Sequence, residues 1–194
     1  MKRILISTTA ATALIASFLV LTPRAANAST PVEKFKKMRA ALAKAMQSGE
    51  LKIDLTASKD GVVEVTCTLE GKPLPKDFPL YVETSREGNV MTVDVTADLN
   101  PENYSTIRYG KTQDTLELVP KADPNSKSEV VIDRKTMKPT SWRTMVSKDG
   151  LWGPASAADL AKARSMKSAK SDSTIHAKVK MMMGQDASIR VSGG

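Results

Sequence analysis

The chain has 194 residues, of which 41% are hydrophobic and 26% charged, and a formal net charge of +8. These values fit one domain with a core of ordinary size, and the charge favours anionic partners without indicating nucleic acid. Cys67 is the single cysteine, which excludes an internal disulfide, and we expect a buried, inert thiol rather than an intermolecular bridge or a nucleophile.

The first 28 residues have the pattern of a secretory signal peptide. Two basic residues precede an apolar run, Ile4–Leu21, and small residues at Ala26-Asn27-Ala28 suit a signal peptidase. We expect cleavage after residue 28, which would leave a single globular domain at residues 29–194, secreted or periplasmic, with no integral membrane segment. The alternative is an uncleaved anchor, because the run approaches the roughly 18 residues that span a bilayer.

A helix is predicted at the start of the mature chain. Thr30-Pro31-Val32-Glu33 combines a capping residue, proline at the first helical position and glutamate three residues after the cap. Apolar residues then recur at three- and four-residue steps up to Gly49 and form one stripe. The stripe consists of Phe35, Met38, Leu42 and Met46.

Alternating apolar and polar residues predict a series of strands after this helix. The expected strands lie at residues 51–58, 62–70, 78–85, 89–99 and, as four short strands, within 105–146. Asp60-Gly61 favours a tight hairpin between the first two strands. The one-sided alternation predicts a curved, mostly antiparallel sheet of about 7–10 strands and not a parallel α/β sheet.

A second helix is expected near residues 155–170, because Ser156 and Asp159 resemble a capping box. The two helices packed on the sheet would give an α+β fold. The second helix is basic, which suits an anionic headgroup or polymer but also an ordinary solvated face. Trp142 and Trp152 are candidates to line a ligand pocket or to anchor the helical cover. The candidate ligand-binding residues are therefore Trp142, Trp152, Lys162, Arg164 and Lys167.

The stretch STIHAKVKMMMGQ, residues 173–185, contains the only histidine and three consecutive methionines. We expect it to form the first strand of a closing pair that turns at residues 184–186. Alternation then places Met181 in the core, and His176 and Met182 on the opposite face, on the order of 20 Å apart along the strand. A soft-metal site at His176 and Met182 would therefore need a ligand from a neighbouring strand.

Catalytic patterns are missing from the sequence. There is no G-x-S-x-G, H-E-x-x-H or S-x-x-K motif. Asp94 and Asp98 would lie about 13 Å apart on one strand face, outside the roughly 5–9.5 Å used in glycoside hydrolysis. We therefore expect a protein that is not an enzyme and has no cofactor.

The order of helix, antiparallel strands and later helix is similar to that of the bacterial periplasmic lipoprotein carriers, which have an open barrel and a helical lid. Residues 114–146 look like the strand-loop-strand region of that family in pattern, and the resemblance covers about a third of the chain. It implies a carrier that holds an apolar or lipid-like ligand on the concave sheet face. The alternative is an envelope interaction or structural protein that binds a macromolecular partner through its polar sheet face and basic helix. Soft-metal (copper) binding is the third hypothesis.

Overall fold

The computed structural model describes residues 29–58, 62–97, 99–165, 175–184 and 186–189. The expected signal peptide lies outside these ranges. In chain order the described elements are α1 (Pro31–Gln47), β1 (Leu51–Ala57), β2 (Val63–Leu69), β3 (Lys72–Pro73), β4 (Leu80–Glu87), β5 (Val90–Ala97), the 3-10 helix η1 (Pro101–Asn103), β6 (Tyr104–Tyr109), β7 (Thr115–Pro120), β8 (Ser126–Ile132), β9 (Pro139–Lys148), β10 (Leu151–Pro154), α2 (Ala157–Ser165), β11 (Ile175–Met182) and β12 (Asp186–Ile189).

The strands form three antiparallel sheets, with orders β12-β1-β2-β3, β10-β9-β8-β7-β6 and β11-β5-β4. The mostly antiparallel α+β class is therefore confirmed, but the strands do not form the single curved sheet that we expected. Two proline-containing segments separate the sheets along the chain, residues 74–79 between β3 and β4 and Asn100-Pro101 between β5 and β6. Proline has no N–H to extend a strand ladder, so each of these segments ends the pairing.

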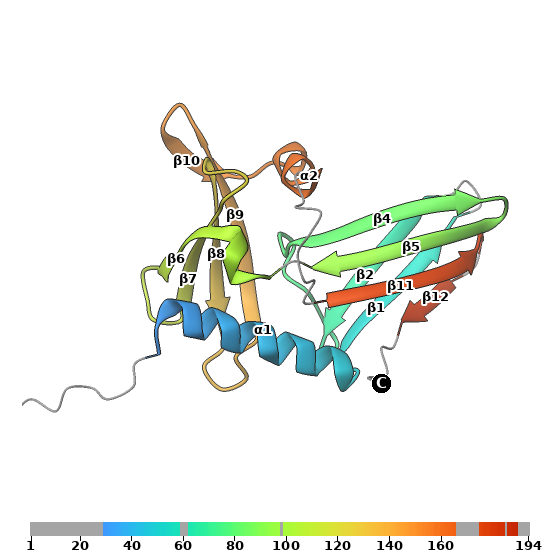
Figure 1. Ribbon diagram of the computed structural model, residues 1–194, viewed down its shortest axis with the longest axis horizontal. Coiled ribbons are helices and arrows are strands. Elements are labelled where there is room, and N and C mark those ends of the chain that lie inside the picture. Colours follow the sequence, from blue (N-terminus) through green and yellow to red (C-terminus); the bar gives the residue numbers. More distant parts are fainter. Residues whose placement is uncertain (1–28, 59–61, 98, 166–174, 185, 190–194) are drawn as a thin grey trace, which may run out of the picture.

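Helix α1 closes one end of all three sheets, as Figure 1 shows. It begins as predicted, because Glu33 N donates to Thr30 Oγ1 at 3.2 Å and Thr30 N donates to Glu33 Oε2 at 2.8 Å. The predicted apolar stripe is also confirmed, since Phe35, Met38 and Leu42 have no exposed surface. This stripe belongs to one hydrophobic core with the apolar faces of the strands.

The segment that leaves the four-stranded sheet after β3 and leads to β4 packs on the five-stranded sheet. Phe78 is buried and packs edge to face on Trp142 of β9, with ring centroids 5.3 Å apart. Next to it, Asp77 Oδ2 accepts a hydrogen bond from Thr144 N at 2.8 Å. The contact therefore buries the two aromatic rings and gives the Thr144 N–H a hydrogen-bond acceptor.

Lys138 makes a second connection between these two sheets. It lies between β8 and β9, and its Nζ is 2.6 Å from Glu50 Oε2 and also contacts Glu70. Hydrogen bonds to Glu50 and then to Glu70 raise the pKa of Lys138 above its ordinary value. The ends of the β1–β2 hairpin are thereby held against the five-stranded sheet.

The strands β11 and β12 do not pair with each other in the described part of the chain, in contrast to the closing pair that we expected. Val179 of β11 is in register with Val93 of β5, whereas Ile189 of β12 is in register with Ile53 of β1. Between them, Gly184 N donates to Ala57 O at 3.0 Å, with Gly184 at a φ of 79° that favours glycine. The turn thus carries the chain from one sheet to another.

Helix α2 covers only part of the range expected for the second helix, since residues 166–170 lie outside the described residues. Its start has the expected side-chain cap, with Asp159 N donating to Ser156 Oγ at 3.2 Å. None of residues 157–162 is buried, because this part of the helix is mostly alanine and polar residues with little apolar area to cover a sheet. Within the described ranges, no helix is both long and apolar enough to cross a membrane.

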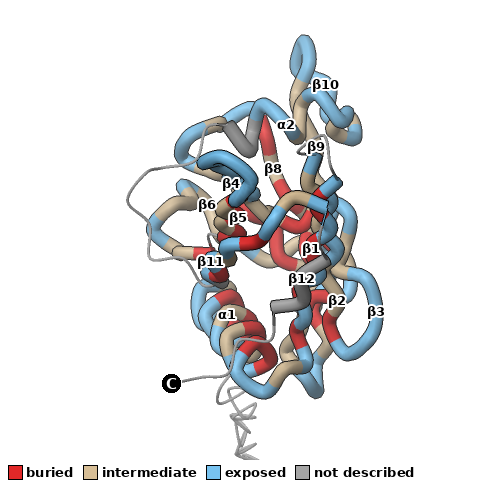
Figure 2. Tube along the Cα trace, turned by 90° about the vertical axis from the view of Figure 1, so that its right-hand side faces the viewer, coloured by how far each residue is buried: buried red, intermediate tan, exposed pale blue. Residues whose placement is uncertain are grey.

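The β9–β10 hairpin was not predicted from the sequence. It turns at Asp149 and Gly150, whose φ angles of 54° and 79° are those of a type I′ turn, the tight connection that Asp-Gly favours. The hairpin projects from the molecule (Figures 1 and 2), and Leu151 is 78% exposed at its tip.

Candidate functional site: a groove between α1 and η1

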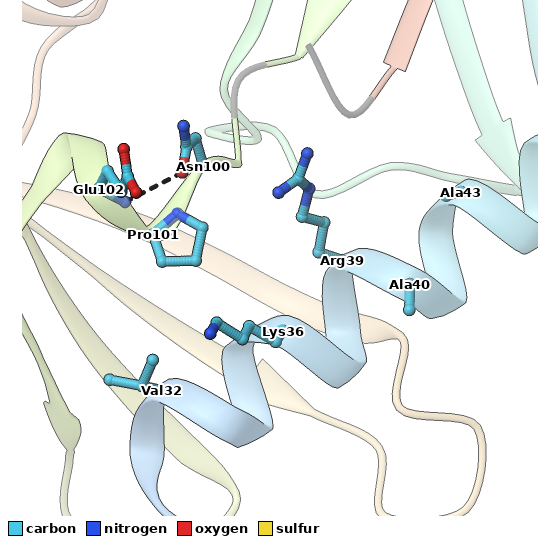
Figure 3. A pocket seen from close by; sticks show the side chains of 8 residues that line it. All are labelled: Val32, Lys36, Arg39, Ala40, Ala43, Asn100, Pro101 and Glu102. Atoms are coloured by element: carbon cyan, nitrogen blue, oxygen red, sulfur yellow. Dashed lines mark hydrogen bonds between the residues drawn. The ribbon is translucent and has the colours of Figure 1, made fainter. Parts of the chain in front are cut away.

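A groove of about 590 Å³ lies between the outward side of α1 and the segment that contains η1 (Figure 3). Its volume falls in the range of roughly 300–1,000 Å³ that is usual for small-molecule sites. The lining residues are Val32, Lys36, Arg39, Ala40, Ala43, Asn100, Pro101 and Glu102.

The helical wall of the groove comes from one face of α1. Positions 32, 36, 39, 40 and 43 recur at three- and four-residue steps, so their side chains line up beside the buried stripe. Ala40 and Ala43 are small and leave space above the helix, and Val32 is 38% exposed at its start. This wall is therefore mainly apolar, with two cationic side chains along it.

The opposite wall is a short segment that its own hydrogen bonds hold in shape. Asn100 Oδ1 accepts from Glu102 N at 3.1 Å, and Asn100 O accepts from Asn103 N at 3.0 Å. Pro101 fixes the first helical φ between them. Just before this segment, Leu99 is fully buried in the core and anchors it.

The two walls are joined beneath the groove by an aromatic pair. Phe35 of α1 packs edge to face on Tyr104, which directly follows η1, with ring centroids 5.3 Å apart. Such pairs contribute about 0.5–1.5 kcal/mol beyond burial of their area. The separation of the walls is thus set by the core, and a ligand would meet a groove that is already formed.

The charges along the groove are not neutralised within the described part of the protein. Lys36 and Arg39 lie on α1 and make no ion pair with any described residue, and Glu102 lies on the other wall. The inward-facing Lys34 differs, since its Nζ lies 3.2 Å from Asp114 Oδ1. The groove therefore carries a net positive charge that is open to a ligand.

The polar groups of the groove are of few kinds. Its polar side chains are amide, carboxylate, ammonium and guanidinium groups, without a hydroxyl, thiol or imidazole. Elsewhere in the described ranges, no group of three or more His, Cys, Asp or Glu side chains is placed to hold a metal ion.

The two tryptophans proposed as ligand-binding residues have different environments, and neither lines the groove. Trp142 is only 4% exposed and is a core residue beside Phe78. Trp152 is 43% exposed on β10, where Lys127 Nζ lies 4.8 Å from the centroid of its ring. The structure does not bring the two rings together in a pocket.

Of the basic residues proposed on the second helix, Lys162 is not among those that line the groove. Lys162 is exposed on α2. Arg164 belongs to the same helix, but its side chain is outside the described part, and Lys167 lies outside the described residues altogether.

The proposed metal ligands His176 and Met182 lie six residues apart on β11, in register with Thr96 and Val90 of β5. His176 Nε2 lies 3.2 Å from Asp94 Oδ1 of β5, whereas Met182 is 53% exposed and in register with Val90. The neighbouring strand thus offers a carboxylate to the histidine and an aliphatic residue to the methionine. Met181 is buried, which confirms its prediction as a core residue.

The groove was not predicted from the sequence, although the residues of its helical wall follow a recognisable pattern. The outward positions 32, 36, 40 and 43 of the predicted helix repeat at helical spacing, and three of them are apolar and one is basic. The other wall, Asn100-Pro101, was interpreted only as the end of a strand. The proximity of the two walls depends on the tertiary contact between Phe35 and Tyr104, which no local sequence pattern reveals.

No protein-family model, curated protein or solved structure matches this chain.

Proposed function

We propose that the protein is a non-enzymatic binding or carrier module of an extracytoplasmic compartment, and that its ligand lies in the groove between α1 and η1. The observation that carries this proposal is a preformed groove whose helical wall is mainly apolar. Preformed, largely apolar concavities with a few polar groups are the usual form of small-molecule sites.

The groove is a better seat for a ligand than the sheet face that the resemblance to lipoprotein carriers implies. Phe35, Met38 and Leu42 of α1 are fully buried against the apolar sides of the strands. A ligand on that face would have to displace these side chains, and each large-to-small loss of core contact costs about 2–5 kcal/mol. The groove requires no such displacement.

The shape of the groove suits an elongated ligand. From position 32 to position 43 the lining follows α1 for about 16 Å, at ~1.5 Å per residue. Ala40, Ala43 and Pro101 provide apolar contacts along this length. An apolar chain would therefore lie along the helix rather than enter the core.

The groove function is tested with a neutral apolar fluorophore, N-phenyl-1-naphthylamine, titrated into the mature domain. Ala40→Trp fills the groove from an exposed helical position, so we expect it to abolish probe binding. Gln47→Trp is the matched control, because it adds the same ring to an exposed position of α1 outside the groove. Equal probe binding by wild type and Ala40→Trp would refute this location.

The compartment is proposed from the N-terminal pattern of charged residues, apolar run and small residues at 26–28. Expression of the full chain in a bacterium should give an exported protein whose intact mass corresponds to a chain that begins at Ser29. A protein that keeps its first 28 residues would instead support the uncleaved anchor.

A second candidate is an envelope interaction protein, which the basic outward side of α1 favours. Lys37 and Lys44 are exposed, lie outside the groove and make no ion pair with described residues. A macromolecular anion could contact these side chains together with the edge of the groove. This candidate gains if wild type binds no apolar probe and native mass spectrometry finds no apolar molecule on the purified domain.

A further inference from the structure

The two cations of the groove are placed to act together. Lys36 and Arg39 are three residues apart on α1, a spacing that makes side chains neighbours on a helix. In Figure 3 both side chains leave the helix on the side that faces Asn100 and Pro101. An anion in the groove would therefore be within reach of an ammonium and a guanidinium group at once.

Nothing in the described part of α1 neutralises this pair. Its only acidic residue, Glu33, accepts the hydrogen bond from Thr30 N at the start of the helix. The buried cation of the same helix, Lys34, is by contrast satisfied by Asp114. Arg39 is half-buried, and a partly desolvated guanidinium gains more from a carboxylate than a fully hydrated one does.

The apolar part of the groove lies next to these charges. Ala40 and Ala43 continue from Arg39 towards the C-terminal end of α1 on the same face. A ligand with an anionic head at Lys36 and Arg39 would thus lay its apolar tail over the alanines. Arg and carboxylate geometries match in a bidentate arrangement, which fixes the head.

Glu102 on the opposite wall limits the charge that the ligand carries. Among the described lining residues, two cations and one carboxylate give a net charge of +1, which one negative charge on a ligand would balance. A second negative charge would face Glu102 and be repelled.

On these grounds, and resting on the groove function proposed above, we infer that the ligand is a single-chain amphiphile with one carboxylate head, of the long-chain fatty acid class, whose carboxylate is bound by Lys36 and Arg39. The volume of about 590 Å³ accommodates a ligand of this size. Neutral chains of the same length would fit the alanines but leave the two cations without a counter-ion.

The test compares laurate with methyl laurate as competitors for N-phenyl-1-naphthylamine, at pH 8 and below the micelle concentration. The two molecules share the same chain and differ in charge. We expect laurate to compete about tenfold better with wild type, and the double variant Lys36→Ala/Arg39→Ala to lose this preference while keeping its affinity for the ester.

Two further variants separate local contact from general charge. Lys37→Ala removes one positive charge from an exposed position of α1 outside the groove, so the preference for laurate should persist. Glu102→Gln removes the carboxylate on the opposite wall, and laurate should then bind several-fold more tightly. Far-ultraviolet circular dichroism and thermal unfolding of each variant show that the fold is retained.

The possible failures are distinguishable. Equal competition by laurate and methyl laurate with wild type would overturn the inference of a carboxylate head and leave the groove function standing. A loss of preference in Lys37→Ala as large as in the double variant would also overturn it, because the effect would then come from net charge. Failure of wild type to bind the neutral probe at all would refute the groove function itself.

Discussion

Phe78 and Trp142 meet edge to face with ring centroids 5.3 Å apart, although one lies between β3 and β4 and the other in the five-stranded sheet. Both side chains are buried, and Asp77 beside Phe78 accepts the hydrogen bond of Thr144 N on the same strand as Trp142. Through the segment after β3, the four-stranded sheet is therefore connected to the five-stranded sheet by core packing and not only by the chain.

Replacing Phe78 by alanine should lower the free energy of unfolding by about 3–5 kcal/mol, because it leaves a cavity against Trp142. Denaturant unfolding measures this change. The exposed Leu151→Ala is the control and should change stability by less than about 0.5 kcal/mol. Equal effects of the two substitutions would show that Phe78 is not part of the core.

Lys34 should contribute to stability, in contrast to its exposed neighbour Lys37 on the same helix. Lys34 Nζ donates to Gln113 O and lies 3.2 Å from Asp114 Oδ1, so Lys34→Ala leaves a carbonyl without its donor and should cost about 1–3 kcal/mol. Lys37→Ala removes the same charge with an expected effect below about 0.5 kcal/mol. Thermal or denaturant unfolding of both variants compares them directly, and similar losses would contradict the buried pair.

The two tryptophans should respond differently to acrylamide, since Trp142 is 4% exposed and Trp152 is 43% exposed. Trp152→Phe is expected to leave a fluorescence that acrylamide quenches much less than it quenches wild type. Full quenching should return when the variant is unfolded in denaturant. A folded variant that is quenched as readily as wild type would place Trp142 at the surface.

Cys67 is half-buried rather than buried as we expected, but its thiol should still react slowly in the folded protein. Burial, and then the negative charge of Asp54, raise the pKa of Cys67 to about 11. The folded state thus favours the neutral thiol, so its contribution to stability is present below pH 9 and is lost as pH rises from about 9 through about 11. At pH 8, a thiol reagent such as 5,5′-dithiobis(2-nitrobenzoate) should modify the unfolded chain much faster than the folded one.

A control isolates the pH effect of this residue. In Cys67→Ser the loss of stability between pH 9 and pH 11 should be smaller than in wild type, when both are measured by denaturant unfolding. Identical pH profiles would mean that the thiol titrates alike in the folded and unfolded states.

Local features were predictable because a few neighbouring residues determine them. The capping box of α1 needs only Thr30, Pro31 and Glu33, and the antiparallel pairing of β1 with β2 needs only alternation in two adjacent segments. The tight turn expected at Asp60-Gly61 lies outside the described residues. The inward and outward positions of Met181 and Met182 likewise follow from strand alternation.

The long-range features depend on contacts between distant residues and could not be predicted. The packing of the separate sheets on one another depends on contacts such as Phe78 with Trp142, and the groove depends on the contact of Phe35 with Tyr104. The expectation that the second helix packs on the sheet was not met, for a different reason. Its capping signal at Ser156 predicted a start, but its alanines have too little apolar area to cover a sheet.

The pairing of β11 and β12 has a consequence for how the protein reaches its folded state. Ile53, near the start of the domain, is in register with Ile189, almost at the end of the chain. Strand β5 likewise pairs with β11, which is synthesised much later. Both sheets keep an open edge until synthesis is nearly complete, and such distant pairing slows folding. Completion of these two sheets only after nearly the whole chain has been made would be compatible with the export that we propose from the N-terminal signal.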